Sequence, residues 1–140
     1  MKYFVLISFV VVGFISCKTF PSRYKEPPNN PRTLIINTSA VYSAELNKIR
    51  ILDTKIIGDI LQMKIEYSGG CEKHDFNLIF NGIWKKSMPP KITLFLEHKY
   101  EHEKCKSLVS KVIKFDIKKL KEKNSEVYIN LVGYSKSIKY

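Results

Sequence analysis

Residues 58–67 read GDILQMKIEY, and their pattern decides the fold class of the chain. Every second residue from Leu61 to Tyr67 is apolar, and the residues between them are polar or charged. This alternation places apolar side chains on one face of a β-strand and polar side chains on the other. The preceding Gly58-Asp59 pair is a two-residue hairpin signal, because glycine accepts the positive φ of such turns. The sequence therefore predicts two antiparallel strands, over 49–57 and 60–67.

The same period of two recurs through the rest of the chain, and no segment keeps a helical period over three turns. After Phe80, the Asn81-Gly82 pair is a second hairpin signal, followed by apolar Ile83 and Trp84. Together these patterns predict an all-β fold, an antiparallel, immunoglobulin-like β-sandwich of about seven short strands. The alternating apolar residues of the further strands are Phe76, Leu78 and Phe80; Ile92, Leu94 and Leu96; Ile113, Phe115 and Ile117; and Val127, Ile129 and Leu131.

The amino-terminal segment has the character of a bacterial lipoprotein signal. Lys2 gives a short positive start, residues 4–15 are almost entirely apolar, and Ser16 directly precedes Cys17. The apolar run is shorter than the roughly 20 residues of a membrane-spanning helix, which favours a cleaved signal over a retained span. We expect a signal peptide over 1–16 and lipidation of Cys17, although Phe14 stands where such signals prefer an aliphatic residue.

The segment from Cys17 to residue 32 is expected to be a lipid anchor and an extended tether. It has no periodic apolar pattern, and its prolines fix φ and remove backbone donors. The folded domain is expected over 33–140, as one domain, because removing 16 of the 140 residues leaves 124. The prolines of this segment are Pro21, Pro27, Pro28 and Pro31.

The chain is strongly basic. Lys2 is the only charge in the signal, so 24 − 1 = 23 basic and 13 acidic residues remain, a formal net charge of +10. Export argues against a nucleic-acid partner, because an envelope protein does not normally meet one. The basic side chains are expected to form a solvated surface, with anionic lipid or acidic polysaccharide as possible contacts.

Both remaining cysteines and all three histidines lie within 71–105. They form two clusters, Cys71-x2-His74 and His98-x3-His102-x2-Cys105. His74 has the strand parity of the apolar residues at 76 and 78, and His98 that of the apolar residues at 94 and 96, so both are expected to point inward. If the two segments pair, Cys71 and Cys105 lie within reach of one another.

Three interpretations of this constellation remain open. The first is a structural disulfide between Cys71 and Cys105, because exported thiols meet an oxidising environment. The second is a metal site, with zinc as the default ion, formed from both cysteines with His74 and His98, and with His102 as a further candidate ligand. The third is a copper or redox-active site, although no Cys-x-x-Cys motif is present.

Other signals of chemistry are weak. Glu97, Glu101 and Glu103 flank the histidines; each could orient an imidazole or complete a metal shell, but solvation of a loop is the more common role. The sequence has no nucleophile elbow, no zinc-protease helix and no dinucleotide fingerprint. A small hydrolase with His74 or His98 as general base is disfavoured, because no activated nucleophile accompanies either residue.

Residues 67–76, which read YSGGCEKHDF, resemble an element of a group of small bacterial lipoproteins with the pattern Gly-Gly-Cys-x-x-His-x-Phe. The likeness extends over about 49–132, with weaker matches at 94–98, at Cys105 and at 115–117. It implies a shared fold and carries no catalytic residue over to this chain. In that group an acidic residue often precedes the second cysteine, whereas this chain has Lys104.

The sequence thus predicts a protein of the bacterial cell envelope, held on the outer membrane or the periplasmic face by lipid at Cys17. We expect a non-catalytic binding module without a cofactor, whose partner is an envelope protein, a polysaccharide or an anionic lipid. The alternative is a zinc- or copper-binding module that uses Cys71, His74, His98 and Cys105.

Overall fold

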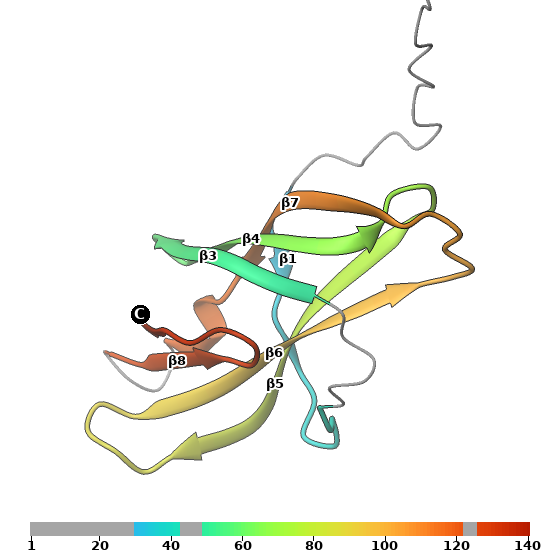
Figure 1. Ribbon diagram of the computed structural model, residues 1–140. Helices are drawn as coiled ribbons and strands as arrows, with labels where there is room; N and C mark the ends of the chain where they lie inside the picture. The colour runs from blue at the N-terminus through green and yellow to red at the C-terminus, as the bar shows by residue number, and fades with distance from the viewer. Residues whose placement is uncertain (1–29, 43–48, 122–125) are drawn as a thin grey trace, which may run out of the picture.

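A computed structural model of the chain describes residues 30–42, 49–121 and 126–140 (Figure 1). The predicted signal peptide, Cys17 and most of the predicted tether lie outside these residues. None of the helices in the described part has the length and apolar character needed to cross a bilayer. The elements are β1 (Arg32–Thr33), β2 (Ile35–Ile36), β3 (Ile49–Ile57), β4 (Ile60–Gly69), β5 (His74–Lys85), β6 (Lys91–Tyr100), β7 (Ser107–Asp116), the 3-10 helix η2 (Lys118–Leu120), β8 (Tyr128–Leu131) and β9 (Ser137–Lys139).

The described strands form two sheets, which confirms the predicted all-β fold. One sheet has the order β1-β7-β4-β3 and the other has the order β2-β5-β6-β8-β9. The sheet with β3, β4 and β7 forms one layer in Figure 1, and the sheet with β5, β6 and β8 forms the other. Seven of the described strands have three or more residues, in line with the number predicted.

The hairpin predicted at Gly58-Asp59 is confirmed. Strands β3 and β4 are antiparallel, with Ile57 opposite Ile60, and Gly58 has a φ of +60°. A turn of this kind needs positive φ, which glycine adopts without the steric cost that a Cβ brings. The alternation from Leu61 onward then places every second side chain of β4 in the core.

The hairpin predicted at Asn81-Gly82 is wrong. Strand β5 runs through this pair, and the ladder with β6 shifts register between Phe80 and Trp84. Gly82 has a φ of +80°, and the Asn81 side chain accepts a hydrogen bond from the backbone N–H of Ile83. An Asn-Gly pair supplies the same positive φ to a bulge as to a turn, so here it bends a strand instead of ending it.

Three pairings are parallel, and in this respect the sheets differ from the antiparallel, immunoglobulin-like arrangement predicted. They are β1 with β7, β2 with β5, and β6 with β8. The chain leaves β6 for the opposite sheet, runs along β7, and returns through η2 to lie beside β6 again. Because this excursion brings the chain back to the starting end of β6, β8 runs in the same direction as β6.

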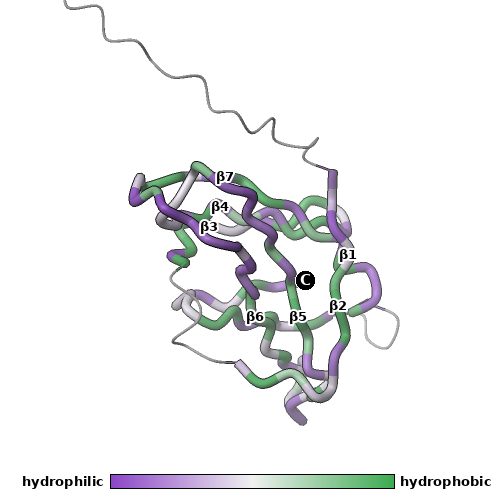
Figure 2. The backbone as a smooth tube through the Cα atoms, turned by 90° about the vertical axis from the view of Figure 1, so that its right-hand side faces the viewer, coloured by the Kyte–Doolittle hydropathy of each residue, from purple (hydrophilic) through white to green (hydrophobic). Residues whose placement is uncertain are grey.

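The core lies between the two sheets and takes its side chains from the alternating positions. A short segment closes one side, where β1 pairs with β7 and β2 pairs with β5 (Figure 2). Leu34, which lies between β1 and β2, is buried. The fully buried large side chains are Phe76, Phe115, Leu34, Leu61, Met63, Ile65, Leu78, Ile92, Leu94, Ile117, Leu120 and Ile129. All of the apolar residues that the period of two predicted to face inward are among the buried residues.

Candidate functional site

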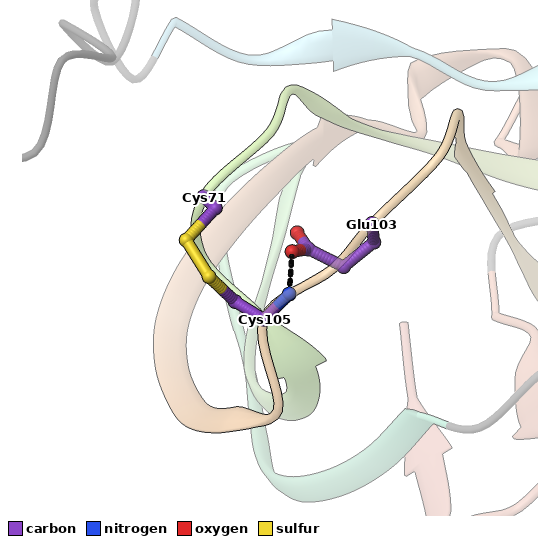
Figure 3. Close-up of side chains that lie close together, drawn as sticks. All are labelled: Cys71, Glu103 and Cys105. Atoms are coloured by element: carbon purple, nitrogen blue, oxygen red, sulfur yellow. Dashed lines mark hydrogen bonds between the residues drawn. A yellow bond between two sulfur atoms is a disulfide. The ribbon is translucent and has the colours of Figure 1, made fainter.

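The two crossings between the sheets at one end of the sandwich are joined by a disulfide. Cys71 lies between β4 and β5, and Cys105 lies between β6 and β7, so each cysteine is in a segment that passes from one sheet to the other. Their sulfurs are bonded, and their Cα atoms are 5.7 Å apart (Figure 3). The disulfide interpretation of these cysteines is confirmed.

Beneath the disulfide, His74 and His98 form a buried pair. His74 begins β5 and His98 lies near the end of β6, and both point inward, as their strand parity predicted. Their exposed fractions are 4% and 8%. His74 Nδ1 lies 2.8 Å from His98 Nε2, which makes a hydrogen bond between the two rings.

Glu103 binds this pair to the loops above it. Its Oε2 lies 2.7 Å from His74 Nε2, and its side chain is only 5% exposed. The same oxygen accepts hydrogen bonds from the backbone N–H groups of Gly70 and Glu72, while Oε1 accepts one from the N–H of Cys105 (Figure 3). One carboxylate therefore holds both crossing segments and one ring of the histidine pair.

The hydrogen bonds fix where the protons lie. A carboxylate only accepts, so His74 Nε2 carries the proton that it donates to Glu103. In neutral His74, Nδ1 is then an acceptor, and His98 Nε2–H donates to it. If His74 gains a proton, Nδ1–H donates to His98 instead. Both rings cannot be protonated with this bond intact, because two N–H groups would then face each other.

The environment shifts the pKa values of two members of the cluster. Burial and, to a smaller extent, the neighbouring His74 together lower the pKa of His98 to about 4. Burial acts to raise the pKa of Glu103, but the hydrogen bonds from Cys105, His74, Glu72 and Gly70 outweigh it, and the pKa falls to about 2. At neutral pH the cluster thus contains an ionised Glu103 and a neutral His98.

Aromatic rings surround the histidine pair. The ring of Phe76 is parallel to that of His98, with centroids 4.6 Å apart, and Tyr100 stacks on His74 at 5.4 Å. Tyr67, from the opposite sheet, lies 4.7 Å from His74 and 5.2 Å from His98. These contacts exclude water from the rings and restrict them to one orientation.

Gly69 makes room for this arrangement. It is buried at the end of β4 and has a φ of +147°. A Cβ at this position would lie 2.6 Å from two ring atoms of His74 and 2.9 Å from Glu103 Oε2. Glycine is therefore required here both for its backbone conformation and for the close approach of the imidazole.

The structure brings together some of the predicted site residues and separates others. Glu103 is the acidic residue that orients an imidazole, while Glu97 accepts a hydrogen bond from Asn77 and pairs with Lys99, and Glu101 is exposed. His102 is exposed and has a φ of +49°.

The predicted metal site with His74 and His98 does not form in this structure. Both sulfurs are bonded to each other, so neither is a thiolate ligand. The two ring nitrogens of His74 make hydrogen bonds to His98 and to Glu103, so neither nitrogen is available to bind an ion together with the sulfurs.

No family model matches this chain, and no curated protein matches it in sequence. Its fold is similar to those of known crystal structures, and two of them have TM-scores above 0.5. One is of a putative toxin-related protein from Parabacteroides distasonis, with a TM-score of 0.51, 18% identity and 79% of this chain covered. The other is of a NigD-like immunity protein from Bacteroides caccae, with a TM-score of 0.54, 10% identity and 81% of this chain covered. The match spans 61% of each of those chains.

Proposed function

We propose that this protein is a lipid-anchored protein of the bacterial cell envelope whose β-sandwich binds a partner and catalyses no reaction. The observation that carries the proposal is the closed state of the cluster under the disulfide. Both ring nitrogens of His74 are engaged, Glu103 is held by four donors, and the two sulfurs are bonded. Side chains used in this way stabilise the end of the sandwich, and they are poorly placed to act on a substrate.

The proposed location rests on the amino-terminal segment. The positive start, the short apolar run and the Ser16-Cys17 junction favour cleavage before Cys17 and lipidation of its thiol. The disulfide agrees with an oxidising compartment, since such bonds are rare in the cytosol. Replacing Cys17 with serine should release the protein from the membrane fraction and abolish labelling by a fatty-acid probe. Unchanged labelling and membrane association of Cys17→Ser would rule out this anchor.

We take the partner to be another protein. One structure of similar fold is described as a NigD-like immunity protein, and the pairs that colicin DNases form with their immunity proteins are among the tightest protein complexes known. Several large apolar side chains are also exposed on the described surface, among them Ile36, Val41, Ile83 and Leu108. The fully buried centre of a protein interface is more apolar than the rest of the surface, and side chains of this kind can supply it.

The test is crosslinking in intact cells followed by capture of the full chain from the envelope fraction. The control bait is an unrelated secreted β-sandwich of similar net charge, because a basic surface binds acidic molecules without specificity. A protein partner that is retained at 0.5 M NaCl, where the Debye length is only about 4 Å, would support the proposal. If the bait captures only anionic lipid or polysaccharide, and this material is released at 0.5 M NaCl, the result would count against a protein partner. A hydrolytic activity that disappears in His74→Ala would contradict the non-catalytic role.

A further inference from the structure

The disulfide and Glu103 bring three metal-binding groups close together. A carboxylate oxygen of Glu103 and the sulfurs of Cys71 and Cys105 all lie within 4.8 Å of one another (Figure 3). Thiolate sulfur and carboxylate oxygen both bind zinc, at about 2.3 Å and 2.0–2.2 Å. We propose that reduction of the Cys71–Cys105 disulfide converts this end of the sandwich into a zinc site with the two thiolates and the Glu103 carboxylate as ligands.

The two cysteines are correctly spaced for a shared ion. Two sulfurs on one tetrahedral zinc are about 3.8 Å apart, given a zinc–sulfur distance of about 2.3 Å. The Cα atoms of Cys71 and Cys105 are 5.7 Å apart, and rotation of both side chains can open the sulfurs to that separation without moving the backbone. Cys71 is exposed, so an ion from solvent can reach the sulfurs, and water can take the fourth position.

The loops stay together after reduction because the disulfide is not their only link. Glu103 accepts hydrogen bonds from Gly70 and Glu72 in one crossing segment and from Cys105 in its own. Glu103 also accepts a hydrogen bond from the buried ring of His74. These contacts keep the two segments in register while the sulfurs are free.

Glu103 is already positioned as a ligand. A carboxylate offers about four lone-pair sites, two on each oxygen. Oε2 is occupied by His74, Gly70 and Glu72, whereas Oε1 accepts only from the N–H of Cys105 at 2.6 Å, which leaves a lone pair of Oε1 for an ion. The other oxygen is fixed by His74 at 2.7 Å, in the way that hydrogen-bonded partners orient metal-binding carboxylates. His74 therefore positions the ligand and does not bind the ion, and His98 holds His74.

The chemistry balances with a dithiol as the reductant. The dithiol transfers two electrons and two protons to the disulfide, its own sulfurs become joined, and Cys71 and Cys105 become thiols. Zinc then replaces the two thiol protons, which pass to the buffer, so binding at neutral pH releases up to two protons for each ion.

The experiment titrates zinc into the full chain, after reduction and before it, with a competing chromophoric chelator as the readout. We expect the reduced protein to bind one zinc ion and the oxidised protein to bind none. Glu103→Gln should lower the zinc affinity of the reduced protein at least about tenfold. Even the loss of a residue that only hydrogen-bonds to a metal ligand lowers metal affinity about 10–100-fold. The matched control is Glu101→Gln, in the same segment and exposed, which should leave the affinity unchanged.

Two results would overturn the proposal. One is a reduced protein that binds no more zinc than Cys71→Ser/Cys105→Ser, and the other is a folded Glu103→Gln with the wild-type affinity. If Glu103→Gln does not fold, X-ray absorption of the zinc-loaded wild type decides the matter. Two sulfurs with oxygen ligands support the site, and two sulfurs with two imidazoles refute it. Neither result depends on whether the sandwich binds a partner protein.

Discussion

Replacing Gly69 with alanine tests the tight packing of the cluster under the disulfide. The new Cβ would lie 2.6 Å from the ring of His74, which both of its hydrogen bonds prevent from moving freely. Overpacking of a core by one carbon costs about 1–3 kcal/mol. The φ of +147° is unfavourable for alanine and adds a cost of about 1–3 kcal/mol. We therefore expect Gly69→Ala to lower the free energy of unfolding by about 4 kcal/mol.

The matched control is Gly133→Ala. Gly133 also has a positive φ, +81°, but a Cβ there would meet nothing within 4 Å. It should cost only the backbone term, about 1–2 kcal/mol. Urea unfolding of the two variants measures the difference, which we expect to be about 2 kcal/mol or more. Long-range proton–nitrogen NMR spectra report at the same time whether Nε2 of His74 keeps its proton.

A difference below about 0.5 kcal/mol between Gly69→Ala and Gly133→Ala would refute the reasoning, because the close approach of His74 is what separates the two sites.

Three further predictions concern pH, the disulfide and the core. The pKa of His98 in the folded protein, about 4, lies below the ordinary value of 6.5, so the unfolded chain takes up a proton first as the pH falls. The free energy of unfolding should therefore decline by about 1–2 kcal/mol between pH 6.5 and pH 4, allowing for partial solvation of the ring. Chemical denaturation of His98→Gln over this range should show a flatter dependence of stability on pH. Cys71→Ser/Cys105→Ser opens a loop with a sequence separation of 34 and should lower the free energy of unfolding by about 4 kcal/mol on the chain-entropy model. Reduction of the wild type in the presence of a chelator should lower it by the same amount. A decrease under about 1 kcal/mol would show that Glu103 alone holds the two crossing segments together. Phe115→Ala should lower the free energy of unfolding, measured in urea, by about 3–5 kcal/mol, because Phe115 is fully buried. Leu108→Ala on the same strand should lower it by less than about 0.5 kcal/mol, because 70% of Leu108 is exposed. Similar decreases for the two variants would contradict the assigned inner face of β7.

Local patterns were sufficient to predict most of the strands. The period of two identified the buried face of β4, and Gly58-Asp59 located its hairpin with β3. Asn81-Gly82 was misjudged because a positive φ serves a bulge as well as a turn, and only the ladder between β5 and β6 distinguishes the two. The parallel pairings were out of reach, since they depend on where the chain returns after crossing to the other sheet.

Local patterns also predicted part of the site, namely the histidine pair and the disulfide. Strand parity placed His74 and His98 inward, and export together with the cysteine count predicted the disulfide. The role of Glu103 could not be separated from those of its acidic neighbours, because it lies in a loop where no periodicity gives direction to a side chain. Which glutamate reaches His74 is decided by the path of that loop between the two sheets.

The short closing segment has a mechanical consequence for a domain tethered at its amino end, as we propose. Strand β1 lies parallel to β7, with Arg32 opposite Phe115, and the chain continues directly into β2 on the other sheet. A pull on the tether along the strand axis shears these ladder bonds together instead of peeling them one after another. The load is then shared between both layers before it reaches the core, so the domain can stay folded while the surface that holds it moves.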